Sequence, residues 1–182
     1  MTVEEFWRIV ESTHDPDMNR NERALSAALN ELPIREVIEF DRIWTDRFCE
    51  LYAYPLWGVA CLVLGSCSDD GFMDWRDWVV SGGQRVFELA RDSPDDLVDM
   101  FDGEPNAGME GIGYVHQRCV EDRSDEFDEP YPDYDICEIH PDQPSGLNWQ
   151  SHAQLKELLP KCYAKYYSRL CISIEGDPIT ST

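Results

Sequence analysis

Residues that could carry out chemistry gather in one short stretch, residues 65–79, which reads Gly-Ser-Cys-Ser-Asp-Asp-Gly-Phe-Met-Asp-Trp-Arg-Asp-Trp-Val. Neighbouring carboxylates can act as general acid and base or can hold a hard cation. A thiol just before a helix can be acidified by the helix N-terminus, although nearby carboxylates oppose this effect. If the chain is an enzyme, its catalysis, with or without the help of a metal ion, would rest on Asp69, Asp70, Asp74 and Cys67.

The spacing within this stretch predicts a two-faced helix. At about 100° per residue, the rings and aliphatic groups of Phe72, Trp75 and Val79 fall on one face. The opposite face carries Asp70, Asp74 and Asp77. We therefore expect the aromatic side chains to turn inward and the carboxylates to turn outward.

The stripe of carboxylates on this helix can also be explained in two ways that do not involve catalysis. Acids in the first turn, after an N-cap such as Ser68 or Asp69, stabilise the start of a helix. Like charges that share a stripe also repel each other and favour water, an arginine or a cation. The stripe could thus be a plain solvated face or a binding surface, and in the second case its residues are Asp70, Asp74, Asp77 and Arg76.

Two pairs of cysteine and histidine have the spacing of metal ligands. His116-x-x-Cys119 and Cys137-x-x-His140 are separated by 17 residues, a span like those that link zinc ligand pairs. The alternative is a core position, because Cys119 shares a helical face with Val115 and a buried thiol behaves as a small hydrophobe. Zinc at these four residues is one hypothesis, and no other cofactor is expected.

The charge of the chain excludes some partners and favours others. The formal charge of −22 and the pI near 4.3 argue against binding nucleic acid or an anionic membrane, since both require clustered basic residues. Residues 92–142 hold 17 acidic residues and two basic ones. This segment is either a solvated surface that keeps the protein soluble or a surface that steers a basic partner.

The pattern of apolar residues predicts an all-α fold with a single compact domain over residues 1–174. Thr2 and Glu5 form a capping box before a first helix. The longest apolar stripe recurs at three- and four-residue intervals through Val37, Phe40, Trp44, Phe48 and Leu51. Further helices are expected over about 21–32, 55–65, 72–80, 86–91, 94–101, 109–122 and 152–170. An acidic, proline-rich loop over 124–146 and a frayed tail over 175–182 complete the prediction.

Cysteine usage and the absence of long apolar runs predict a cytoplasmic protein. Seven cysteines without regular spacing fit reduced thiols better than a disulfide framework. The longest apolar run, residues 55–65, is too short to cross a bilayer and is interpreted as a core helix. The N-terminus lacks the basic and apolar regions of a signal peptide. The sequence leaves the oligomeric state open.

The chain resembles the bacterial family catalogued as domain of unknown function 4240. The resemblance rests on residues 65–72 and 74–79, on Leu-Trp-Gly-Val-Ala at 56–60, on Gly83 and Pro94-Asp95, on the opening Phe6-Trp7, and on Leu-Leu-Pro at 158–160. Departures are Ser66, where a second glycine is usual, Trp75, where phenylalanine is usual, and the acidic insert after Asp122. The resemblance implies an all-helical fold and brings no catalytic residues.

Two functions remain open. The first is a protein-binding module, of the kind formed by immunity-type inhibitors or regulatory adaptors, which engages a basic partner through its acidic surface. The second is the small enzyme described above. A pocket lined by the three aspartates would favour the enzyme, whereas aspartates spread over the surface would favour the binding module.

Overall fold

The computed structural model describes residues 1–100, 111–126 and 141–170, which form helices with their connections and a non-helical stretch over 141–151. The all-α prediction is confirmed for them. Most of the predicted acidic loop and the predicted tail lie outside the described residues. Within the described ranges, no helix combines the length and the apolar character needed to cross a bilayer.

The chain begins with two helices whose starts are fixed by side-chain caps. In α1 (Val3–Thr13), Thr2 Oγ1 accepts from the Glu5 amide at 3.2 Å, and the Glu5 carboxylate accepts from the Thr2 amide at 2.7 Å. This confirms the predicted capping box. Asp17 caps α2 (Met18–Asn30), which therefore starts three residues before the predicted position at Asn21.

The predicted apolar stripe runs along α3 (Ile34–Glu50), the longest of the described helices, and ends at its C-cap, Leu51. Its five members are all buried, with exposed fractions of 3% or less. Pro33 is the N-cap of this helix. The stripe packs on α1, where the ring of Phe6 lies 4.7 Å from the ring of Phe40 and 6.2 Å from that of Trp44.

Helix α4 (Tyr54–Leu64) is the central helix. It is apolar on nearly all sides, and most of its side chains are therefore buried. It is followed by α5 (Asp69–Ser81) and by α6 (Gln84–Asp92). Helix α5 contains most of residues 65–79, which we call the chemical stretch. A 3₁₀ helix, η1 (Pro94–Met100), takes the place of the short α-helix expected after Ser93. The region expected as a helix over 109–122 contains η2 (Ile112–Tyr114) and α7 (Val115–Glu121), followed by the 3₁₀ turn η3 (Ser124–Glu126).

The C-terminal helix predicted over 152–170 is wrong as a single helix. Ser151 caps α9 (His152–Leu158), but the backbone leaves the helical conformation at Leu159, with φ −131° and ψ 60°. Pro160 then starts α10 (Pro160–Tyr166), which continues into η4 (Tyr167–Arg169). The break occurs because proline disfavours the helical conformation in the residue before it and has no amide to continue the ladder.

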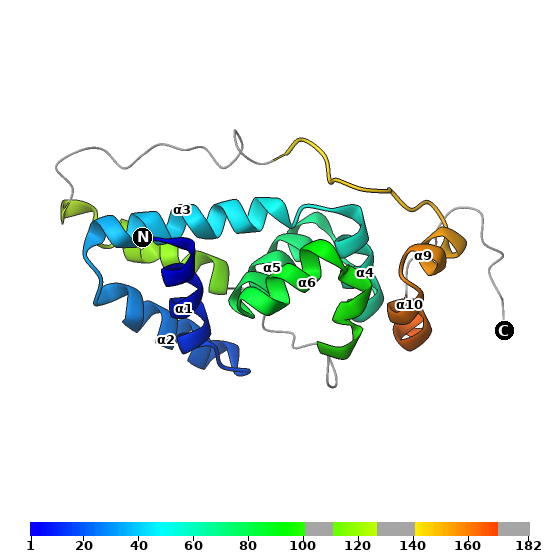
Figure 1. Cartoon of the computed structure of the whole chain (residues 1–182), viewed down its shortest axis with the longest axis horizontal. Coiled ribbons are helices and arrows are strands. Elements are labelled where there is room, and N and C mark those ends of the chain that lie inside the picture. The colour runs from blue at the N-terminus through cyan, green and yellow to red at the C-terminus, as the bar shows by residue number, and fades with distance from the viewer. Residues whose placement is uncertain (101–110, 127–140, 171–182) are drawn as a thin grey trace.

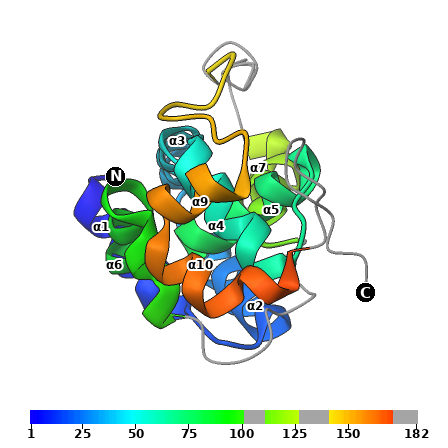
Figure 2. The same ribbon diagram turned by 90° about the vertical axis from the view of Figure 1, so that its right-hand side faces the viewer.

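The helices pack around α4 and α5. In Figure 1, α3 runs along one edge, α1 and α2 lie at one end of the long axis, and α9 and α10 lie at the other end. Figure 2 views the molecule from that second end, where α9 and α10 cover α4. Leu155 and Leu159 approach α4 closely at Gly58, where a Cβ would lie only 2.8 and 2.9 Å from their methyl carbons.

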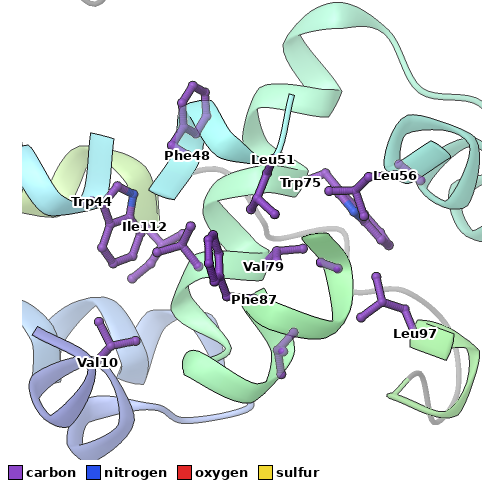
Figure 3. Close-up of a cluster of buried hydrophobic side chains, with 14 of the residues drawn as sticks. Val10, Trp44, Phe48, Leu51, Leu56, Trp75, Val79, Phe87, Leu97 and Ile112 are labelled. Atoms are coloured by element: carbon purple, nitrogen blue, oxygen red, sulfur yellow. The ribbon is translucent and has the colours of Figure 1, made fainter. Parts of the chain in front are cut away.

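One hydrophobic core runs through these layers. Figure 3 shows side chains from several elements meeting around Val79 of α5, including Leu51 at the end of α3 and Phe87 of α6. Burying large apolar side chains of this kind is the main stabilising term, at roughly 1.5–3 kcal/mol each.

Candidate functional site

The chemical stretch forms a turn followed by α5, as predicted. Ser68 is the N-cap, and its hydroxyl accepts from the Gly71 amide at 3.2 Å. Asp69 and Asp70 lie in the first turn and are exposed, while Asp74 is half-buried. Phe72, Trp75 and Val79 have exposed fractions of 1% or less, so the predicted apolar face is buried.

Cys67 is half-buried, and its backbone lies beside two side chains of α4. Its carbonyl oxygen accepts from the indole nitrogen of Trp57 at 3.0 Å and lies 3.9 Å from the Cys61 sulfur. Burial, together with the smaller effects of Cys61, Asp74 and Asp69, raises the pKa of the Cys67 thiol to about 12. The thiol therefore stays protonated at neutral pH, which disfavours a nucleophilic role.

Arg76 does not lie with the carboxylates on the surface, because its side chain is buried among aromatic rings. The guanidinium carbon is 3.8 Å from the centre of the Phe48 ring and 4.7 Å from that of Tyr52. The guanidinium also donates to the carbonyls of Phe48 and Phe72 at 3.4 Å. Burial lowers the pKa of Arg76 to about 10, so this cation is retained at neutral pH by its rings and carbonyls.

Asp77 also turns away from the expected acidic face. Its Oδ1 accepts from the indole nitrogen of Trp44 in α3 at 2.7 Å, and its Oδ2 faces Gly113 in η2. A Cβ at Gly113 would lie 2.1 Å from that oxygen, so only glycine permits this contact. Burial raises the pKa of Asp77 to about 6, although the Trp44 hydrogen bond opposes the increase.

A second buried polar pair lies beside this contact and joins α3 to α7. Nδ1 of His116 lies 2.5 Å from Oδ1 of Asp41, and both side chains are only 2% exposed. The imidazole packs on Trp44 with its ring centre 5.0 Å away. Its other nitrogen, Nε2, is buried and has no hydrogen-bond partner among the residues that the structure describes. Burial of these groups makes the junction of α3, α5 and α7 unusually polar for a core.

The zinc hypothesis can be followed only for half of its ligands. Cys137 and His140 lie outside the described residues. In the described half, His116 contacts Asp41, and the Cys119 sulfur lies 3.8 Å from the hydroxyl of Ser26. Across the described residues, no three His, Cys, Asp or Glu side chains meet as a metal-binding group.

A hollow of about 530 Å³ lies between η1, the end of α6, the start of α4 and the segment at Ser145. Its apolar lining includes Pro55, Leu56 and Leu158, and its acidic lining is Asp92, Asp95 and Asp96. The hollow has the size of a small-ligand site. The aspartates of the chemical stretch are not part of its lining.

The acidic side of the hollow already binds cationic and N–H groups of the chain. Asp95 accepts from the amides of Lys161 and Cys162 at 3.0 and 2.9 Å and thereby caps α10. The ammonium group of Lys161 pairs with Asp96. The Arg91 guanidinium makes two hydrogen bonds to Asp92, at 2.7 and 2.8 Å.

Two of these features were missed in the sequence. Asp41 and His116 are 75 residues apart, and no local spacing links them. The position of Asp95 after Ser93-Pro94 indicates the start of a helix at Pro94. It does not indicate that Asp95 caps α10. The acidic bias of residues 92–142 was the only indication of a negatively charged surface here.

Comparison with known proteins supports the resemblance drawn from the motifs. A family model described as "Protein of unknown function (DUF4240)" matches residues 1–122. No curated protein and no solved structure matches the chain. The matched residues contain the chemical stretch, the buried polar junction and the η1 side of the hollow, whereas α9 and α10 lie beyond them.

Proposed function

We propose that this chain, which belongs to the DUF4240 family of proteins of unknown function, is a protein-binding module that engages a basic partner protein. Its role is that of an immunity-type inhibitor or a regulatory adaptor in the cytoplasm. Both roles need the same thing, which is a surface that recognises lysine or arginine side chains of another protein.

The observation that carries this proposal is the hollow beside η1. An arginine or lysine side chain has an aliphatic stem and a charged end, and it binds best where apolar walls meet carboxylates. Pro55, Leu56 and Leu158 supply the walls, and Asp92 and Asp96 supply the charge. The formal charge of −22 adds long-range attraction, which speeds the encounter with a cationic partner.

The chain's own cations support this assignment of partner chemistry. Lys161 and Arg91 already pair with Asp96 and Asp92 at this surface. Such exposed pairs are worth only about 0.2–1 kcal/mol each. A partner that brings several basic residues at once can therefore replace them at little cost.

The test uses a fluorescent arginine-rich peptide and compares two double variants with equal loss of charge. Asp92→Asn with Asp96→Asn alters the hollow, whereas Glu36→Gln with Glu39→Gln alters exposed acids in the first half of α3. Asp95 is left intact because it caps α10. We expect the hollow variant to weaken binding roughly tenfold and the α3 variant to leave it nearly unchanged.

The same variants then serve as baits for the natural partner. The wild-type chain should capture a basic protein from lysate at about 50 mM salt and release it at about 500 mM salt, because exposed charges are screened. The hollow variant should capture less of the same protein than the α3 variant. Equal weakening by both double variants, or a partner indifferent to salt, would contradict the proposal.

A further inference from the structure

The carboxylate of Asp77 is the meeting point of three elements. It accepts from Trp44 of α3 at 2.7 Å, it belongs to α5, and it faces the backbone of η2 at Gly113. Because η2 leads directly into α7, this contact joins the start of the η2–α7 segment, residues 112–121, to α3 and α5. We call Trp44, Asp77 and Gly113 the Asp77 joint.

The joint has no room for adjustment on the η2 side. The place of a Gly113 Cβ lies 2.1 Å from Oδ2 and 3.0 Å from Oδ1 of Asp77, so the carboxyl group lies directly against the backbone. Glycine offers this carboxyl group no side-chain donor of its own. On that side, the protein therefore stabilises a charged Asp77 carboxylate less than water would.

Charged groups approach the joint from each neighbouring element. Helix α3 contributes Asp41, which contacts His116 of α7. Helix α5 itself contributes Arg76 and Asp74. Helix α2 brings Glu22 to Gly111, two residues before Gly113, while α1 contributes the uncharged ring of Phe6 against Trp44.

We propose that the Asp77 joint is a proton-responsive contact. It holds the η2–α7 segment firmly when Asp77 carries a proton, and it holds this segment less firmly when Asp77 is a carboxylate. The device is local, since it governs one segment and does not require the rest of the fold to open.

The direction and size of the response follow from linkage. The pKa of Asp77 is about 6 in the closed joint, because burial outweighs the opposing effects of Trp44, His116 and Arg76. In an open joint the carboxyl group meets water and returns to its ordinary value of 3.8. The open form then gains about tenfold in population between about pH 5 and about pH 7.5.

Hydrogen exchange of the full chain tests this proposal. Protection factors, which correct for the effect of pH on intrinsic exchange, are measured for residues 112–121 and for α4 at about pH 5 and about pH 7.5. We expect residues 112–121 to open more readily than α4 at both values, with about a tenfold loss of protection at the higher pH. Asp77→Asn keeps an acceptor for Trp44 and should remove the pH dependence.

The matched control is Asp70→Asn, which removes an exposed carboxylate of the same helix and should behave as the wild type does. Three results would overturn the proposal. Residues 112–121 could show no dependence on pH, the dependence could persist in Asp77→Asn, or these residues could open only together with α4.

Discussion

The indole nitrogen of Trp44 donates a 2.7 Å hydrogen bond to Asp77, although the two residues are 33 positions apart and Asp77 belongs to the face of α5 that its helical period assigns to solvent. The carboxylates of that face consequently differ in their surroundings. Asp70 is exposed, whereas Asp77 is held between α3 and η2. A binding surface on α5 would therefore rely on Asp70 and Asp74 more than on Asp77 or the buried Arg76.

Replacing Asp77 by asparagine should stabilise the protein above pH 6. The folded-state pKa of Asp77 is raised to about 6, so the fold binds this proton more tightly than the unfolded chain does. Stability is therefore lost as pH rises from about 4 to about 6 and stays lower above that range. We expect the variant to exceed the wild type by roughly 1–3 kcal/mol at neutral pH.

Urea unfolding at a series of pH values measures this effect. The difference between variant and wild type cancels the titration of all groups that the two proteins share. It should be small near pH 4 and should grow up to about pH 6. Equal unfolding free energies at neutral pH would show that the carboxylate is not penalised in the fold.

Gly113→Ala should destabilise the protein by roughly 1–3 kcal/mol, because the new methyl group overlaps Oδ2 of Asp77. Adding Asp77→Ala should recover part of this loss, which a double-mutant cycle by thermal or urea unfolding would quantify. Gly71→Ala is the control. Its Cβ would meet only ordinary contacts at 3.4 and 3.6 Å, and alanine favours the helix, so stability should be unchanged or slightly higher.

Asp95→Ala should cost about 1–2 kcal/mol, because it leaves the first amides of α10 without their acceptor. Asp96→Ala removes only an exposed pair with Lys161 and should cost less than about 0.5 kcal/mol. Unfolding free energies of the two variants provide the comparison. Similar losses for both would mean that Asp95 does not act as the cap of α10.

The Cys67 thiol should resist alkylation in the native protein. Its pKa of about 12 lowers the thiolate fraction near pH 8 by about a thousandfold relative to an ordinary cysteine. Iodoacetamide labelling followed by peptide mapping should therefore modify Cys67 slowly in buffer and rapidly in urea. Rapid native labelling would instead restore Cys67 as a candidate nucleophile.

The sequence was sufficient to predict features that depend on the residues of a single helix. The regular stripe of α3 and the capping box of α1 are local patterns, and both were found as predicted. Arg76 was also readable, because it falls about 40° from Phe72 on the helical wheel and hence on the apolar face. Its charge, by contrast, favours a position on the acidic surface.

Features that depend on two distant segments could not be found in this way. Nothing near Asp41 signals the histidine that contacts it, and the period of α5 does not reveal that η2 covers Asp77. Pro160 by itself indicates a break in the helix. The apolar residues on both sides of it keep helical spacing, however, and this pattern predicts one continuous helix instead of two short ones.

The close approach at Gly58 bears on how the protein could be divided. The family match ends at residue 122, yet the methyl groups of Leu155 and Leu159 and the indole of Trp149 rest on the backbone of α4 at that glycine. A fragment that ends at residue 122 would expose an apolar surface of α4 to water. The stretch matched by the family model is thus shorter than the stretch that packs as one body, and recombinant pieces of this protein should retain α9 and α10 to remain monodisperse.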